Sequence, residues 1–371
     1  MKTKRITSLL LSLILSLSIL SACGASSNAV TFTVSGPDNN FSIHTPLQLE
    51  YFSGGDFKAA HDYATGEAEL SLPLPANFEW SLEGLSTQPA SYTVSLSKNS
   101  DMKDAKLYKT ESSSLQVYNL EIDTDYFWTV TANCGEKSYT SAVKNFHVAN
   151  DGPRNIYVMG VTNFRDIGGR TSELGGKVRQ GLIFRCGTLN EGALDDSRDR
   201  IKPEGKKVML EDLGVKTEID LRKSYDYENT GTNKSPLGET VTYYAFPMDY
   251  NLPTWLDTFK VEIKDIFALL SDKSNYPVFI HCSIGTDRTG MMGFLINALL
   301  GVSESELYFD YMFSNFGKIG GTRNIDAIWG YINHVAKYEG DTLSKRVENY
   351  LLDIGVTPEQ IASFLEIMLE K

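Results

Sequence analysis

A cysteine and an arginine in the second half of the chain have the spacing of a nucleophile and an anion-binding group. Five residues separate Cys282 from Arg288. A thiolate can attack phosphorus to form a covalent intermediate, and the planar fork of a guanidinium binds two phosphate oxygens. The pair therefore predicts a site at which Cys282 attacks a phosphate monoester to form a phosphocysteine, while Arg288 stabilises the charge that develops in the transition state.

A strand and a helix are expected to hold this segment in place. Residues 278–280 are an apolar run typical of a buried strand, and residues 288–300 are apolar on nearly every side, which indicates a buried helix. A loop at the N-terminus of a helix binds anions through its backbone N–H groups and the helix dipole. The groups expected to bind the phosphate are those of Ser283, Ile284, Gly285 and Thr286.

The same surroundings favour the anion of the cysteine. We expect the pKa of Cys282 to lie well below that of a free thiol. Thr289 is expected to donate a hydrogen bond to the sulfur, which makes the sulfur a better leaving group when the phosphocysteine is hydrolysed. Gly285 and Gly290 permit the unusual backbone angles of such a loop and the close approach of a ligand.

Three motifs resemble a known family. Residues 281–290, His-Cys-x-x-Gly-x-Asp-Arg-Thr-Gly, resemble the signature of the cysteine-dependent protein tyrosine phosphatase superfamily, and most of all its bacterial tyrosine and lipid phosphatase branch. Residues 163–169, Asn-Phe-Arg-Asp-Ile-Gly-Gly, are similar to the branch's N-terminal motif, residues 185–189, Arg-Cys-Gly-Thr-Leu, are similar to its second motif, and the resemblance covers residues 154–371. It implies an α/β phosphatase that hydrolyses phosphotyrosine-type substrates, phosphorylated proteins or small phosphate esters, without a metal or an organic cofactor. It also places Arg165 and Asp166 among the substrate-binding residues.

Two carboxyl groups are candidates for the acid that protonates the leaving oxygen. Asp287 lies in the loop, and phosphatases with an aspartate at that place are thought to use it as the acid, so it is the first choice. Asp249 follows the predicted strand 241–246 and is the alternative, because other branches carry the acid on a separate loop. Either carboxyl group has to hold its proton in the enzyme–substrate complex.

Two other functions stay open. The branch usually has a lysine where this chain has Thr286, and that lysine is credited with gripping phosphoinositide headgroups. The departure speaks against lipid substrates. The two alternatives are an inositol phosphate or phosphoinositide phosphatase, and an inactive cell-surface protein that only binds phosphorylated ligands.

The charges limit the expected partners. The formal net charge is −12, which disfavours binding to nucleic acid and to anionic membrane surfaces. Between residues 154 and 185, however, six cations accompany only two acids. This local reversal is expected either to steer anionic substrates or to be a solvated face whose cations pair with acids elsewhere. Five histidines without ligand spacing predict no metal site.

Two domains are expected. Alternating large residues over 41–150 predict an all-β sandwich, whose second half resembles a fibronectin type III domain. The phosphatase-like domain is expected over 151–371, with a central, mostly parallel sheet flanked by helices. Its strands are expected at 181–185, 216–221, 241–246 and 277–281, and its helices near 255–270, 288–300, 303–313, 325–337, 343–352 and 358–369.

The N-terminus has the pattern of an exported lipoprotein. Three cations within the first five residues precede an apolar run over 9–20, which suits the hydrophobic region of an export signal. The sequence Leu-Ser-Ala-Cys23 resembles a lipobox, in which the cysteine is diacylated. Residues 1–22 are therefore expected to be a signal peptide and residues 23–40 a tether, and lipidated Cys23 is expected to anchor the protein to the extracytoplasmic face of the cell membrane.

Overall fold

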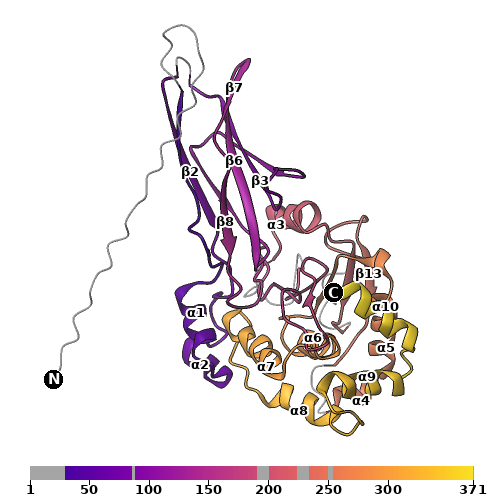
Figure 1. Cartoon of the computed structure of the whole chain (residues 1–371). Helices are drawn as coiled ribbons and strands as arrows, with labels where there is room; N and C mark the ends of the chain where they lie inside the picture. The colour runs from indigo at the N-terminus through magenta and orange to yellow at the C-terminus, as the bar shows by residue number, and fades with distance from the viewer. Residues whose placement is uncertain (1–29, 86–87, 190–199, 224–233, 250–253, 371) are drawn as a thin grey trace, which may run out of the picture. The chain divides into compact units, whose positions relative to one another are not determined.

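The computed structural model describes residues 30–85, 88–189, 200–223, 234–249 and 254–370, and Figure 1 shows the order of its elements. The chain divides into two compact units. Unit 1 comprises Met1–Phe41, Ala76–Val117 and Asp125–His147, and unit 2 comprises Ser42–Pro75, Tyr118–Thr124 and Val148–Lys371. The expected signal peptide and Cys23 lie outside the described residues. Within the described ranges, no helix has the length and apolar composition needed to span a membrane.

The described part of unit 1 consists of strands and their connections. Along one strand, Ala76, Phe78 and Trp80 are buried while the residues between them are exposed, which is the period of two that a half-buried strand requires. One sheet has the order β1-β2-β5, and the other has the order β4-β3-β6-β7 with β8 also paired to β6. The strands are β1 (Thr31–Ser35), β2 (Ala76–Glu83), β3 (Ser91–Ser97), β4 (Lys106–Thr110), β5 (Ser114–Val117), β6 (Thr124–Cys134), β7 (Lys137–Thr140) and β8 (Lys144–Val148).

A five-stranded sheet lies at the centre of unit 2, in the order β13-β12-β14-β11-β9. Four strands are parallel, and β9 (Arg165–Asp166) is antiparallel to β11 at one edge. The parallel strands are β11 (Ile183–Cys186), β12 (Thr217–Asp220), β13 (Thr242–Ala245) and β14 (Val278–His281). They overlap the four predicted strand segments, so the mostly parallel sheet is confirmed. Because parallel strands end at one edge, the residues that follow them meet there.

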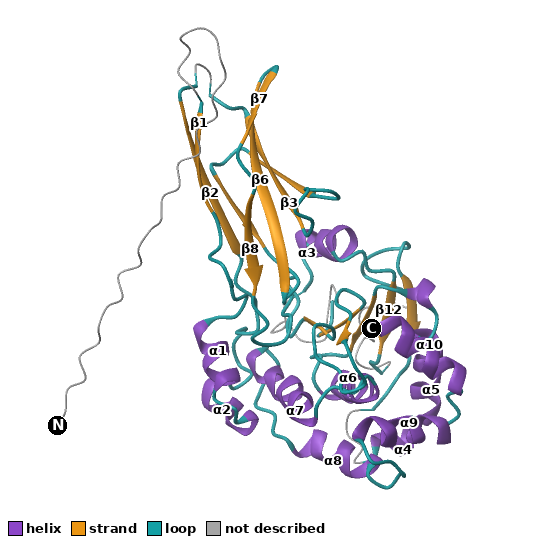
Figure 2. Ribbon diagram, in the orientation of Figure 1, coloured by secondary structure: helices purple, strands orange, loops and turns teal. Residues whose placement is uncertain are grey.

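Side chains of these strands alternate between two apolar clusters, so both faces of the sheet are covered (Figure 2). Val278 and Ile280 pack on the face with most of the helices, whereas Phe279 packs on the other face with Met209. The second face is covered by α3 (Pro203–Lys207) and the π-helical turn η2 (Val208–Asp212). The helices of the first face include α4 (Trp255–Thr258), α5 (Lys260–Leu270), α6 (Asp287–Leu299), α7 (Glu304–Met312), α8 (Asp326–Val335), α9 (Leu343–Asp353) and α10 (Pro358–Met368).

These helices lie where the periodicity predicts them, and local signals fix their starts. Ser303, Thr342 and Thr357 cap α7, α9 and α10, because each side chain accepts a hydrogen bond from the backbone N–H three residues on. The helix predicted over 255–270 is interrupted at Phe259, whose backbone leaves the helical conformation. A small additional pair, β10 (Lys177–Val178) with β15 (Leu369–Glu370), ties the C-terminus to unit 2.

The sandwich boundary predicted from the sequence is wrong for residues 42–75, which are helical and belong to unit 2. Thr45 and Gln48 form a reciprocal capping box at the start of α1 (Pro46–Ser53), which is followed by the 3-10 turn η1 (Phe57–Ala59) and α2 (Ala60–Tyr63). Tyr51 is 1 % exposed, and its ring lies 5.4 Å from that of Phe309 and 5.3 Å from that of Phe316. The alternation further along the chain does not extend into this segment, whose Thr-Pro-x-Gln pattern marks a helix start.

Tyr118–Thr124, a second piece of the predicted sandwich, also belongs to unit 2. The side chain of Gln180 accepts from the backbone N–H of Ile122 at 3.0 Å and donates to its carbonyl at 2.9 Å. Arg154 donates to the carbonyls of Leu120 at 3.1 Å and Asn119 at 2.7 Å. These bonds join segments distant in the chain, so no local periodicity indicates them.

Candidate active site

The predicted strand, loop and helix are all present around Cys282. β14 ends at His281, α6 begins at Asp287, and the loop over 282–286 lies at the carboxyl edge of the sheet. Cys282 is 1 % exposed. Gly285 has a φ of +73°, and a Cβ there would lie 2.5 Å from the backbone of Cys186. Only glycine fits this turn without displacing β11.

Three successive carbonyls of the loop are held from outside. The acceptors are Ser283, Ile284 and Gly285, which are bound by the backbone N–H of Thr188 at 3.1 Å, Nδ2 of Asn163 at 3.0 Å and Nη2 of Arg185 at 2.8 Å. In a planar trans peptide the N–H points opposite to the carbonyl. The N–H groups that follow these carbonyls are therefore turned toward the inside of the loop. This is the geometry that the predicted anion-binding nest requires.

The thiol of Cys282 is surrounded by groups that favour its anion. Burial alone would raise the pKa of Cys282, but the charge of Arg288 and the polar groups of the neighbouring Thr289 outweigh burial and lower it. The charge of Asp287 acts in the opposite direction. The lowered pKa agrees with the sequence-based prediction, whereas the hydroxyl of Thr289 is buried without a hydrogen-bond partner, so its bond to the sulfur stays a prediction.

The guanidinium of Arg288 is fixed beside the loop by three oxygens. Nη1 donates to the carbonyls of Met248 at 3.2 Å and Leu221 at 3.4 Å, and Nη2 donates to the hydroxyl of Ser283 at 3.1 Å. Met248 and Leu221 follow β13 and β12, so the ends of neighbouring strands orient this side chain. Its position agrees with its lowering effect on the pKa of Cys282.

A buried charged cluster holds the end of β14 behind the cysteine. His281 is hydrogen-bonded to Glu218 at 2.9 Å, and its other ring nitrogen lies 3.3 Å from the carbonyl oxygen of Cys282. Burial would lower the pKa of His281, but the charge of Asp220 and the bond to Glu218 raise it. Burial would raise the pKa of Asp220, but His281 and Arg222 lower it to about 2.

Ligand atoms of Glu218, Asp220 and His281 lie within 4.8 Å of one another, the spacing of a metal site. Both oxygens of Asp220 are already bound by Arg222, at 2.5 to 3.1 Å, and one also accepts from the hydroxyl of Tyr243 at 2.8 Å. A metal ion would have to displace the guanidinium. The donor set therefore fits an ion-pair cluster better than a metal centre.

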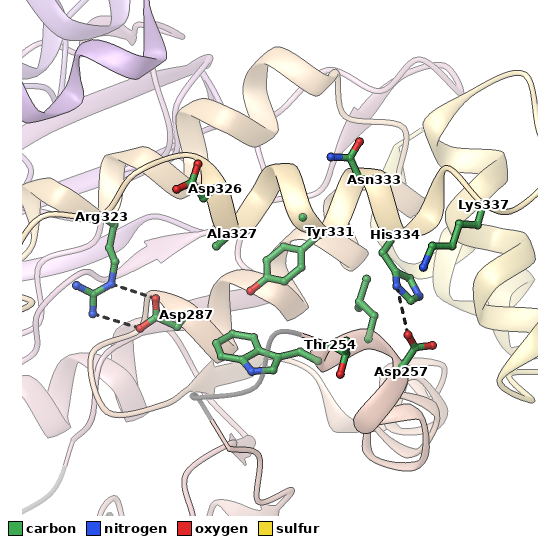
Figure 3. A pocket seen from close by; sticks show the side chains of 13 residues that line it. Thr254, Asp257, Asp287, Arg323, Asp326, Ala327, Tyr331, Asn333, His334 and Lys337 are labelled. Atoms are coloured by element: carbon green, nitrogen blue, oxygen red, sulfur yellow. Dashed lines mark hydrogen bonds and ion pairs between the residues drawn. The ribbon is translucent and has the colours of Figure 1, made fainter.

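Both candidate acids lie next to the loop, and both are ion-paired. Arg323 donates to the two oxygens of Asp287 at 3.1 and 3.3 Å (Figure 3), and the hydroxyl of Tyr311 lies at 3.5 Å. Asp249 pairs with Lys223 and directly follows Met248, the residue that holds Arg288. The structure therefore brings both carboxyl groups to the site.

Arg165 and Asp166, expected to contact the substrate, are instead 0 % exposed. Arg165 donates to Asp310 at 2.9 Å and to the side-chain oxygen of Asn163 at 2.5 Å. Asp166 accepts from Arg154 at 2.8 Å. The prediction that Arg165 and Asp166 contact the substrate is therefore corrected. Both side chains are buried and bound to other residues of the protein, so neither is accessible to a ligand.

The charge reversal over 154–185 also has a structural cause. Four of its six cations are buried and paired with Asp166 or Asp310, namely Arg154, Arg165, Arg170 and Arg185. The ion pairs of the second interpretation are present for these four, but the side chains are buried and do not form a solvated face. Thr286 is buried as well, and its hydroxyl lies 3.2 Å from Asn163 Nδ2, so only its backbone N–H is directed into the loop.

A pocket of about 690 Å³ adjoins the loop and is lined by both Asp287 and Arg323 (Figure 3). Trp255 and Tyr331 form an aromatic wall, with ring centroids 6.2 Å apart and an interplanar angle of 28°. The charge of Cys282 contributes to the raised pKa of Tyr331, after burial and the nearer groups Tyr311 and Asp287. The pocket is of the size that binds small organic groups.

The structure adds residues to which the sequence assigned no role. Asn163 and Arg185 hold loop carbonyls, Asp310 holds the arginines, and Arg323 holds Asp287. Asn163 and Arg185 lie in motifs that resemble those of the family, and this was the indication in the sequence that they have a role at the site. Their partners lie 121 and 100 residues away along the chain, so spacing alone does not pair them.

Comparison with known proteins gives a consistent family. The family model described as "Tyrosine phosphatase family" matches residues 156–370. A tyrosine-protein phosphatase from Nostoc commune is 28 % identical over 120 residues, which are 28 % of this chain and 41 % of the relative. A protein from Cupriavidus necator that is also named as a tyrosine-protein phosphatase is 27 % identical over 176 residues, which are 42 % of this chain and 61 % of the relative. The chain thus matches less than two thirds of the length of either relative.

Solved structures with some likeness include TpbA from P. aeruginosa, with a TM-score of 0.30 and 16 % identity over 47 % of this chain and 86 % of that one. The catalytic core of Siw14, a protein of S. cerevisiae, has a TM-score of 0.32 and 16 % identity over 53 % of this chain and 98 % of that one. A likeness of this degree carries no information on the substrate.

The Gly285→Ala variant tests the geometry of the loop. Because the new Cβ would lie 2.5 Å from the backbone of Cys186, the loop has to shift, and we expect kcat/KM for a phosphate ester to fall by about a hundredfold. Gly214→Ala is the matched control, since Gly214 also has a positive φ, of +62°, but its Cβ would meet no atom within 4 Å. Steady-state kinetics and thermal unfolding of both variants check this; equal losses of activity would contradict it.

Proposed function

The chain belongs to the tyrosine phosphatase family, and from this premise we propose that it hydrolyses phosphotyrosine in proteins through a phosphocysteine at Cys282. One observation carries the proposal. Cys282 lies on the floor of a loop whose N–H groups turn inward, and the guanidinium of Arg288 is fixed beside the same loop. A nucleophile, an anion nest and a bidentate cation at one point are what phosphoryl transfer to sulfur requires.

The first step transfers the phosphoryl group. The Cys282 thiolate forms a bond to phosphorus, the bond from phosphorus to the tyrosine oxygen breaks, and that oxygen takes a proton from an acid. The loop N–H groups and Arg288 stabilise the phosphoryl oxygens as charge moves. In the second step water attacks the phosphocysteine and gives a proton back to the same carboxylate. Thr289 donates to the sulfur as it leaves.

We assign the acid to Asp287. It is the first residue of α6, lines the pocket next to the loop, and carries both its oxygens toward Arg323 within that pocket (Figure 3). Arg323 orients the carboxyl group, and the hydroxyl of Tyr311 adds a longer hydrogen bond of 3.5 Å. Asp249 stays the alternative, because its neighbour Met248 contacts Arg288.

The pocket beside the loop supports an aromatic leaving group. Its wall of Trp255 and Tyr331 offers flat apolar faces, and phenyl rings stack on such faces at a favourable distance. An aryl phosphate on a polypeptide therefore fits better than an inositol carrying several phosphates.

A substrate panel tests the proposal. We expect phosphate release from a phosphotyrosine peptide at a kcat/KM at least about a hundredfold above that for phosphoserine peptide, inositol hexakisphosphate or phosphoinositide vesicles, since only the first presents an aryl leaving group to the pocket. Cys282→Ser is expected to lower the rate by about a thousandfold or more.

Other outcomes of the substrate panel would support other functions. Faster release from the inositol compounds would favour a phosphoinositide phosphatase, and binding of phosphopeptide without turnover would favour an inactive capture protein. Turnover retained by Cys282→Ser would exclude the nucleophile assignment.

The acid is identified by varying the leaving group. In Asp287→Asn we expect kcat/KM for phosphotyrosine to fall by about a hundredfold or more, while an ester whose leaving group needs no proton, such as dinitrophenyl phosphate, loses much less. Asp249→Asn is the matched control and is expected to affect the two esters equally. The reverse pattern between the two variants would move the acid to Asp249.

We further propose that the protein is exported and held at the extracytoplasmic face of the cell membrane through diacylated Cys23, on the strength of the lipobox-like sequence and the apolar run before it. A Cys23→Ala protein is then released from the membrane fraction, and retention there would refute the anchor. We also propose that unit 1 is a fibronectin type III-like spacer. What supports it is the division of its strands into sheets of order β1-β2-β5 and β4-β3-β6-β7.

A further inference from the structure

Three buried arginines share one carboxylate close behind the loop. Arg165 Nε and Arg170 Nη2 donate to Oδ1 of Asp310 at 2.9 and 2.8 Å, and Arg185 Nη1 donates to Oδ2. All four side chains are at most 7 % exposed. Burial and the charge of Arg185 lower the pKa of Arg165 to about 10, so it stays charged at neutral pH. Three positive charges thus meet one negative charge inside the protein.

Two of these arginines are linked to the loop. Arg185 donates from Nη2 to the carbonyl of Gly285 at 2.8 Å. Arg165 donates from Nη1 to Asn163 at 2.5 Å, and the amide of Asn163 donates in turn to the carbonyl of Ile284 at 3.0 Å. In the described residues no hydrogen bond joins Arg170 to the loop.

Glycines of α6 make room for this arrangement. A Cβ on Gly293 would lie 3.0 Å from Nη1 of Arg185, and a Cβ on Gly290 would lie 3.5 Å from its Nη2. Arg185 therefore lies directly against the first turns of the helix that follows the loop. Its contact with Gly285 and its contact with Asp310 are made by two ends of one rigid guanidinium.

We propose that Asp310 is a positioning residue of the phosphate loop, since it fixes the two arginines that turn the carbonyls of Ile284 and Gly285 outward and the N–H groups behind them inward. The proposal rests on the proposed function only in taking phosphate as the ligand of the loop. Asp310 itself touches neither substrate nor sulfur. The excess positive charge of the cluster adds a field that favours an anion in front of it.

Replacing Arg165 or Arg170 by methionine removes the same charge, but this arrangement predicts different effects for the two substitutions. In Arg165→Met the loop loses the support of Asn163, so we expect the dissociation constant of inorganic phosphate, measured by isothermal titration calorimetry, to rise by about tenfold, as for the loss of one hydrogen bond. The pH profile of Cys282 alkylation by iodoacetamide is expected to move to higher pH. Arg170→Met loses a hydrogen bond to the same oxygen of Asp310 but loses no contact with the loop. Both values are therefore expected to change much less in this variant.

Asn163→Gly provides a second route to the same result. Asn163 has a φ of +56°, which glycine tolerates, so this variant removes the relay without backbone strain. It is expected to reproduce the shifts of Arg165→Met even if that variant fails to fold. Thermal unfolding of each variant reports the structural cost separately.

The results divide cleanly. Equal shifts in Arg165→Met and Arg170→Met would contradict the proposal, because they would show that only the total charge of the cluster matters. A lowered Tm with an unchanged phosphate constant and an unchanged alkylation profile would also contradict it, because the cluster would then serve stability alone. Both readouts need no turnover. A wild-type protein that binds phosphate but hydrolyses no ester would thus refute the proposed function and leave this test intact.

Discussion

The planarity of the peptide bond is the constraint on which the site depends. Each loop carbonyl that is pulled outward by the scaffold turns the next N–H inward. The scaffold groups come from three places, the start of β9, the strand β11 and the turn after β11, and all lie in or beside the central sheet. The anion nest is thus a consequence of sheet order, because β11 lies beside β14.

Buried charges surround the loop, and each forms at least one ion pair. Asp310 binds arginines on one side, and the cluster of Glu218, Asp220, Arg222 and His281 lies on the other. Ionised groups that are buried in this way are costly unless they are paired and hydrogen-bonded. Their rigidity means that the dipoles around the cysteine are already oriented when charge develops on a phosphoryl group.

A segment outside the expected catalytic domain supports the same helix that carries Asp310. Tyr51 packs against Phe309, the residue next to Asp310 in α7, and Phe57 stacks on Tyr308 at 4.4 Å. Residues 42–75 are therefore part of the scaffold of the site. An aromatic cluster of this kind adds apolar burial and ring contacts at a place where three cations would otherwise lie near the surface.

The sequence by itself determined the chemistry and most of the elements of unit 2. Cys282, Arg288 and Thr289 are close in the chain, and strand and helix periods are local properties, so their signals are contained within short windows. The tertiary structure alone decided that Arg165 and Asp166 face inward, that residues 42–75 join unit 2, and that Asp310 holds the arginines behind the loop. Apart from the ion pair of Asp166 with Arg154, these facts depend on contacts across 100 residues or more. Such pairings are fixed by sheet order and by the need to compensate every buried charge, and neither is written in the spacing of neighbouring residues.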